Sequence, residues 1–152
     1  MTRTVAREIA LRLCFALAEN PREPEEIIAD IFEEEYYASL KEEDGLYKSL
    51  PDETQMDYIK HLVKGVTMHS PELDGYIEKY AVGWKFGRIS RTAVAIMKVA
   101  MFEVLYMPEV PNKAAINEAM ELAKRYEVPE TVPFVNGVLG SFVRSETEGT
   151  DG

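Results

Sequence analysis

Two arginines and a phenylalanine share one arc of the first helical segment. On a wheel of about 100° per residue, the apolar stripe of residues 3–18 centres near Leu13, while Arg3, Arg7 and Phe15 fall on the opposite arc. Arginine neutralises phosphate, and an aromatic ring stacks on an unpaired base. The pattern has two interpretations: a stacking surface for single-stranded RNA, or a ring that a neighbouring helix covers.

The other reactive side chains assemble no catalytic or metal site. Cys14 is the only cysteine, and His61 and His69 lack partners at ligand spacing. The sequence contains neither a Gly-rich phosphate loop nor a nucleophile elbow. The acidic run 33–35 points in three directions on a helix and is expected to be a solvated charge run. We therefore expect a protein that is not an enzyme, with no cofactor and no metal.

The net charge of −10 is concentrated in one part of the chain. Residues 21–58 hold thirteen acidic and three basic residues, so that this segment alone has a net charge of −10. Residues 1–20 are at +1 and residues 59–152 at −1. The nearly neutral parts can hold a local phosphate-binding patch despite the acidic total.

The apolar spacing is helical along nearly the whole chain, which predicts an all-α fold. We expect a single domain of about seven helices over residues 1–145 and a disordered tail over 146–152. The expected helices cover 3–18, 24–40, 51–68, 70–82, 90–107, 112–126 and a last segment with Thr131 as candidate N-cap and Pro133 in its first turn. Residues 90–107 are apolar nearly all round and are expected to be central, with Trp84 and Phe86 anchoring the preceding turn in the core. No apolar run approaches a membrane span, and a cytoplasmic setting is expected.

Several ordered strings in the chain resemble those of the NusB family of transcription antitermination factors. They are AREIAL at 6–11, ELDGYI at 72–77, the element Trp84…Arg88-Ile89, AMFEVL at 100–105, Val110-Pro111 followed by AINEAMELAK at 115–124, and FVNGVL at 134–139. The resemblance implies a NusB-like bundle of seven helices. It also implies RNA binding without enzymatic activity, together with a small-subunit ribosomal protein, NusE, on the boxA element of nascent RNA. RNA polymerase and other Nus factors are the further partners implied, no membrane is involved, and some relatives form homodimers.

The resemblance also assigns residues to RNA contact. Arg3 and Arg7 stand in a segment that is richer in arginine in the family, and Phe15 occupies the place of a tyrosine. Glu130 matches an acidic position and Phe134 an aromatic one at the start of the last helix. For Phe134 a place in the core is the alternative. The resemblance thus predicts RNA-binding residues in two distant parts of the sequence.

Two other functions compete with the antitermination factor. A helical protein-interaction module that has lost useful RNA affinity would explain the few N-terminal arginines and the charge of −10. A relative of the RNA-binding domain of ribosomal RNA cytosine methyltransferases is disfavoured, because 152 residues leave no room for the methyltransferase domain. Binding of boxA-type RNA with the NusE-like protein separates the first two.

Overall fold

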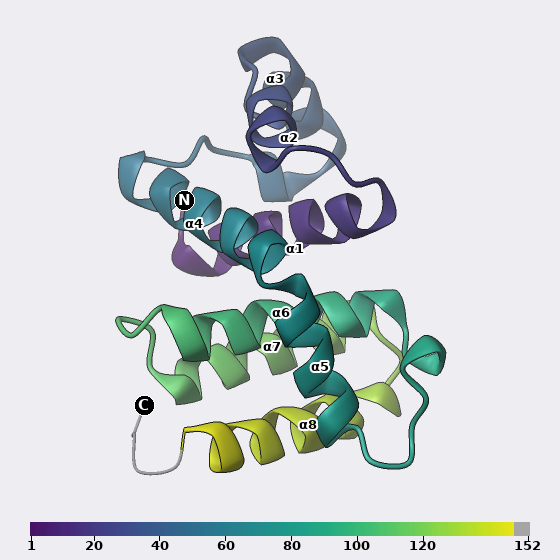
Figure 1. Cartoon of the computed structure of the whole chain (residues 1–152). Coiled ribbons are helices and arrows are strands. Elements are labelled where there is room, and N and C mark those ends of the chain that lie inside the picture. The colour runs from purple at the N-terminus through teal and green to yellow at the C-terminus, as the bar shows by residue number, and fades with distance from the viewer. Residues whose placement is uncertain (148–152) are drawn as a thin grey trace. The chain divides into compact units, whose positions relative to one another are not determined.

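The computed structural model describes residues 1–147, and all of its regular structure is helical (Figure 1). The elements are α1 (Arg3–Glu19), α2 (Pro24–Ile31), α3 (Glu34–Glu43), η1 (Gly45–Tyr47), α4 (Glu53–Met68), α5 (Ser70–Tyr80), η2 (Phe86–Arg88), α6 (Arg91–Tyr106), α7 (Asn112–Tyr126) and α8 (Thr131–Glu146). The predicted fold class is confirmed, with eight α-helices in these residues. Apart from its first two residues, the expected tail at 146–152 lies outside the described residues, and Glu146 itself ends α8.

The chain divides into two compact units where one domain was expected. The first unit is Met1–Thr67, and the second begins at Met68. The first contains α1 to nearly the end of α4, and the second contains α5 to α8.

The second predicted helix is broken in two, and this part of the prediction is wrong. The Glu33 carboxylate accepts hydrogen bonds from the backbone N–H groups of Glu35 and Tyr36, at 3.1 and 2.9 Å. A side chain that satisfies these amides begins a new helix, so Glu33 caps α3 instead of continuing α2. Periodicity alone did not reveal this break, because apolar positions continue on both sides of it.

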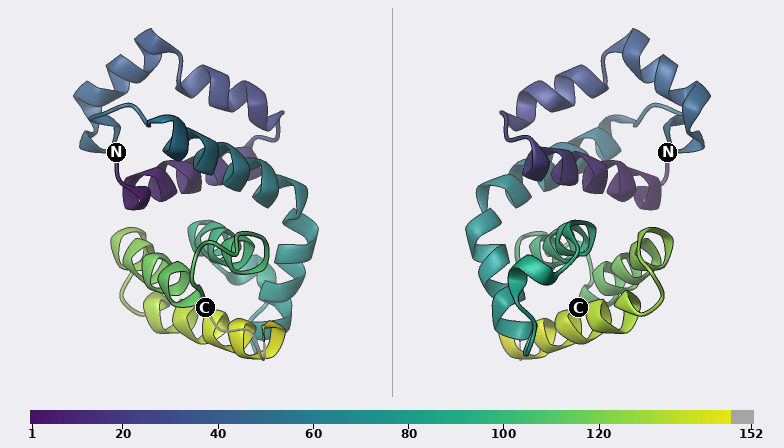
Figure 2. Two further views of the ribbon diagram at one scale, coloured as in Figure 1. Left: turned by 90° about the vertical axis from the view of Figure 1, so that its left-hand side faces the viewer. Right: turned by 90° about the vertical axis from the view of Figure 1, so that its right-hand side faces the viewer.

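Helix α6 is the centre of the second unit, as predicted. Every residue from Ala95 to Glu103 is buried. The helix contacts α5, α7 and α8, and Figure 2 shows α7 and α8 beside it from two sides. Its start is fixed by Ser90, whose hydroxyl accepts a hydrogen bond from the Ala93 N–H at 3.1 Å. A helix enclosed by three others must be apolar on most faces, which explains its sequence.

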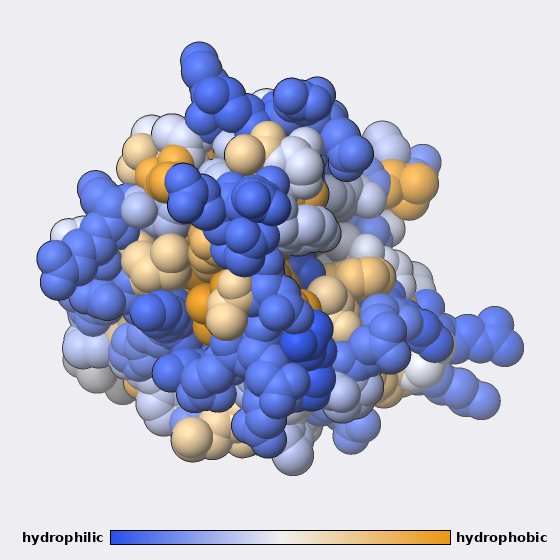
Figure 3. Space-filling model, turned by 90° about the horizontal axis from the view of Figure 1, so that it is seen from above, coloured by the Kyte–Doolittle hydropathy of each residue, from blue (hydrophilic) through white to orange (hydrophobic). Residues whose placement is uncertain are grey.

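The acidic segment lies at the surface of the first unit. Glu33, Glu34 and Glu35 are exposed. The face that carries α2 and α3 is mostly hydrophilic, with hydrophobic residues in small separate patches (Figure 3). The prediction of a solvated charge run is confirmed.

Candidate nucleic-acid interface

The N-terminal arginines are held against an aromatic ring from α4. The Arg3 guanidinium lies 4.0 Å from the centre of the Tyr58 ring, and its Nε donates a 2.8 Å hydrogen bond to Gln55 Oε1. The Arg7 guanidinium lies 5.5 Å from the same ring centre. Tyr58 is 4% exposed, so these cation–π contacts are partly desolvated and stronger than surface contacts. The two arginines therefore form one cluster with α4.

Arg7 does not lie on an exposed arc, and this expectation is wrong. Its side chain is only 4% exposed, whereas Arg3 is half-buried. Leu11, on the same arc, is 2% exposed. The helical wheel shows one apolar stripe, but α1 is covered on more than that face, because buried residues occur all around it. Of the two arginines, Arg3 therefore keeps part of its surface open to solvent, whereas Arg7 is buried.

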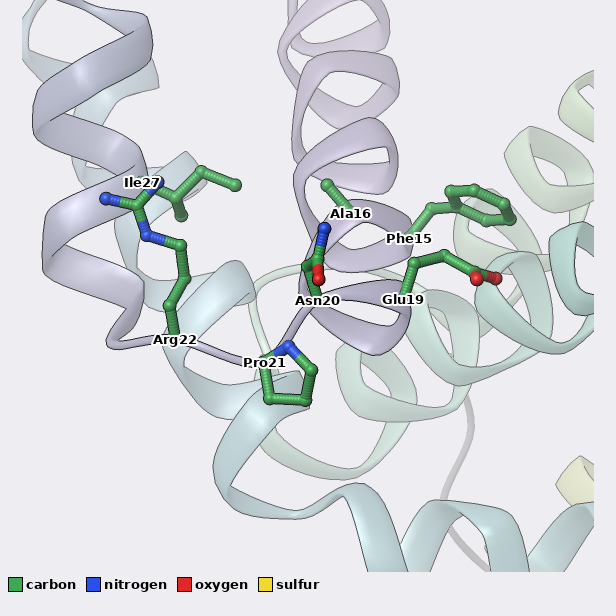
Figure 4. Close-up of a pocket in the computed structure, with 7 residues that line it drawn as sticks. All are labelled: Phe15, Ala16, Glu19, Asn20, Pro21, Arg22 and Ile27. Atoms are coloured by element: carbon green, nitrogen blue, oxygen red, sulfur yellow. The ribbon is translucent and has the colours of Figure 1, made fainter.

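The Phe15 ring lies near the end of α1 and is half-buried. It contributes to an open hollow between the end of α1 and the start of α2. Figure 4 shows Phe15 pointing away from Arg22 and Ile27, so α2 does not cover the ring. Twelve residues separate Phe15 from Arg3, which corresponds to about 18 Å along a helix. The Phe15 ring and the half-buried Arg3 therefore stand near opposite ends of α1.

Arg12, a third arginine of α1, is engaged by acidic neighbours. Its guanidinium lies 2.8 Å from Asp44 Oδ2 and 3.6 Å from Glu8 Oε2. A hydrogen bond from the Leu46 N–H and the pairing with Arg12 lower the pKa of Asp44. This arginine fastens α1 to the segment before η1, and a phosphate would have to displace a carboxylate to reach it.

The second pair of predicted residues lies at the start of α8. Glu130 is the exposed residue immediately before the helix, and Phe134 is half-buried one turn later. Phe134 is therefore not a core residue, and the alternative of a buried ring is wrong. Its ring packs against Trp84, with the ring centres 4.7 Å apart and the planes at 47°. The structure thus places Glu130 and Phe134 together, in a different unit from Arg3, Arg7 and Phe15.

Trp84 was expected in the core and is instead 55% exposed, while Phe86 is half-buried. The expectation for Trp84 is wrong. It was based on residue type, because a large aromatic side chain beside glycines suggests an anchor in the core. Trp84 and Arg88 belong to an element of the family resemblance, but their exposure together with Lys85 in the same turn was not predicted.

Among residues 1–147, no group of three histidine, cysteine, aspartate or glutamate side chains is arranged to hold a metal ion. Within the same residues, no helix combines the length and apolar character that crossing a bilayer requires.

Similar solved structures share this fold. A structure of NusB from T. maritima matches with a TM-score of 0.77 at 23% identity, covering 95% of this chain and 92% of its own. A structure described as the antitermination factors NusB and NusE in complex with double-stranded RNA matches with a TM-score of 0.73 at 20% identity, covering 94% and 96%. At these identities the likeness establishes the fold.

Sequence comparison goes further than the fold. The family model described as "NusB family" matches residues 4–144. The transcription antitermination protein NusB of Acetivibrio thermocellus is 38% identical over all of this chain and 95% of its own length. The protein of the same name from Clostridium novyi is 32% identical over 95% of this chain and 100% of its own. With the family model covering the helical core and the relatives aligned end to end, the chain belongs to the NusB family of transcription antitermination proteins.

Proposed function

We propose that this protein suppresses premature termination, chiefly in ribosomal RNA operons, by binding boxA-type single-stranded RNA together with a NusE-like small-subunit ribosomal protein. The observation that carries the proposal is the 38% identity with a NusB protein over the whole chain. The structure described as NusB and NusE in complex with double-stranded RNA adds that a protein of this fold assembles with NusE and with RNA. In this proposal the protein acts in the cytoplasm and catalyses no reaction. It holds RNA and the NusE-like protein together in one complex.

Four side chains are suited to contact unpaired RNA. The half-buried Arg3 can offer its guanidinium to a phosphate, and Phe15 can offer a ring face to a base. In the second unit, Phe134 presents another ring, and the exposed Glu130 carboxylate can accept hydrogen bonds from base amino groups. In this scheme Arg7 supports α1 through its contact with Tyr58 instead of touching RNA.

A protein-interaction module with little RNA affinity of its own is the second candidate. The burial of Arg7 favours it, since only Arg3 of the two predicted N-terminal arginines is then placed to meet a phosphate. Few phosphate contacts imply weak binding with a shallow salt dependence. The NusE-like protein would then supply most of the RNA affinity.

Fluorescence anisotropy with a labelled boxA-type RNA separates the two candidates. We expect binding that tightens on addition of the NusE-like protein and exceeds binding of a scrambled RNA of equal length. Phe15→Ala is expected to weaken binding by about 1–3 kcal/mol with an almost unchanged salt slope, if a base stacks on the ring. Phe15→Leu is the matched control, because it keeps apolar volume without the aromatic face.

Each alternative has its own result. Equal binding of boxA-type and scrambled RNA, with and without the NusE-like protein, would refute the proposed function. Binding of the NusE-like protein without any gain in RNA affinity would identify the interaction module. If Phe15→Ala unfolds the protein while Phe15→Leu binds RNA normally, the ring is structural and does not contact RNA.

A further inference from the structure

Trp84 and Phe134 form an aromatic pair in which the indole is exposed. Trp84 is the only tryptophan in the chain, and more than half of its surface is open to solvent. Phe134 supports the indole from one side at 4.7 Å and is itself half-buried. A large aromatic side chain held in the open loses the stabilisation that burial would give it, so such a pair is characteristic of binding surfaces.

The loop that carries Trp84 is well fixed. Gly83 has a φ of +84°, a conformation that suits glycine, and the Trp84 N–H donates a 3.0 Å hydrogen bond to the Ala81 carbonyl. Both ends of the loop are anchored, because Ala81 is 3% exposed and Ile89 is 7% exposed. The 3₁₀ turn η2 lies between them. The exposure of the indole is therefore a product of the backbone and not of a loose segment.

The loop itself carries basic and no acidic side chains, and an exposed carboxylate, Glu130, stands one turn before Phe134 on α8. No acidic residue occurs between Glu78 and Glu103, while the same stretch contains five basic residues. Lys79 pairs with Glu146 and Lys98 with Asp74, but Lys85 and Arg88 are exposed and form no ion pair within residues 1–147. In a protein of net charge −10, two unneutralised cations beside an open aromatic pair make a local site for an anion with a planar ring.

We propose that the Trp84 surface, defined as Trp84, Lys85, Arg88 and Phe134, binds a single-stranded segment of RNA. Trp84 stacks on one base, with Phe134 bracing the indole, and Lys85 and Arg88 meet the flanking phosphates. Ring faces next to cations are the combination that proteins use for unpaired nucleic acid. The inference rests on the proposed function and extends it, because it adds a base-stacking surface in the second unit that includes Trp84.

Because Trp84 is the sole tryptophan, its fluorescence reports on this surface directly. We excite the full-length protein at a wavelength selective for indole and titrate it with unlabelled boxA-type RNA, with and without the NusE-like protein. A base stacked on the indole is expected to quench its emission, with a midpoint that matches the dissociation constant from anisotropy. An unchanged emission at saturating RNA would overturn the proposal.

Substitutions then test stacking and charge separately. Trp84→Ala is expected to weaken RNA binding about 5- to 150-fold, and Trp84→Phe to restore most of the loss. The double variant Lys85→Gln/Arg88→Gln is expected to reduce the slope of log K against log salt by about 1.4, because each lost phosphate contact with a single strand accounts for about 0.7. Lys41→Gln/Lys48→Gln is the matched control, since it removes the same charge from exposed positions in the first unit. A control that weakens binding as much as the test pair would contradict a local site.

The failure of this inference differs from the failure of the proposed function. If the wild-type protein binds boxA-type RNA and Trp84→Ala binds it equally well, the Trp84 surface is not an RNA site and the proposed function stands. If Trp84→Ala instead loses the NusE-like protein in the absence of RNA, the surface docks protein and the inference is wrong. If the wild-type protein binds no RNA under any condition, both are wrong. Equal thermal stability of each variant confirms that the comparison concerns folded protein.

Discussion

Replacing Arg7 by alanine should chiefly destabilise the fold. The side chain is 4% exposed and its guanidinium lies 5.5 Å from the Tyr58 ring centre. Truncation removes two buried methylene groups, at about 0.8 kcal/mol each. The partly desolvated cation–π contact contributes roughly 0.5–2 kcal/mol more. Arg7→Ala should therefore lower the free energy of unfolding by about 2–3.5 kcal/mol.

Thermal unfolding and urea titration measure this loss. For a chain of this size the melting temperature should fall by roughly 2–4 °C for each kcal/mol. Arg7→Met separates the two contributions, because it keeps most of the aliphatic stem and loses the charge, so it should be the less destabilised variant. Lys60→Ala is the control on α4, where the side chain is exposed and its loss should cost little.

RNA binding provides the second readout. Arg3→Ala should reduce the slope of log K against log salt by about 0.7, one single-strand phosphate contact, whereas Arg7→Ala should leave the slope nearly unchanged. If Arg7→Ala instead keeps the wild-type melting temperature and reduces the slope of log K against log salt by about 0.7, Arg7 contacts a phosphate. Its assignment as a packing residue would then be wrong.

Three further results should follow from the structure. Ala100 is 1% exposed in the central helix, so Ala100→Leu should overpack the core and cost about 1–3 kcal/mol, measured by calorimetry; an unchanged melting temperature would place α6 outside the core. Glu33→Ala removes the α3 cap and should cost about 0.5–2 kcal/mol in urea unfolding, with RNA affinity unchanged, and a tenfold loss of boxA-type RNA binding would show that this acidic segment contacts RNA. The pKa of Glu146 is lowered by a hydrogen bond from Tyr80 and by Lys79, so its stabilisation is present above the unfolded pKa and is lost as the pH falls through the lowered folded pKa. Glu146→Gln should therefore melt below the wild-type protein at pH 7, and the difference should shrink as the pH falls below 4.5, the ordinary pKa of this carboxyl; a difference that does not shrink in acid would contradict the pairing.

The Glu33 break and the Trp84 loop show where prediction from sequence ended. Helical spacing predicted nearly every other boundary to within two or three residues, because apolar residues recur at helical spacing and prolines such as Pro21, Pro108 and Pro111 interrupt that spacing. Glutamate is uncommon as an N-cap, so the start of α3 at Glu33 cannot be recognised from the surrounding sequence. The exposure of Trp84 depends on Gly83 and on the backbone hydrogen bonds of the loop, none of which the hydrophobic pattern encodes.

The sequence by itself determined the all-α fold, the central position of residues 90–107 and the family, since periodicity and ordered motifs are local properties of the chain. It also identified Phe15 and Phe134 as aromatic side chains of interest. Only the tertiary structure decided which charges reach solvent: Tyr58 of α4 draws Arg7 into a buried contact and leaves Arg3 half-buried. It also decided that Phe134 meets Trp84, fifty residues earlier in the chain. The physical reason is that burial and ring pairing arise between helices, whereas a helical wheel describes each helix alone.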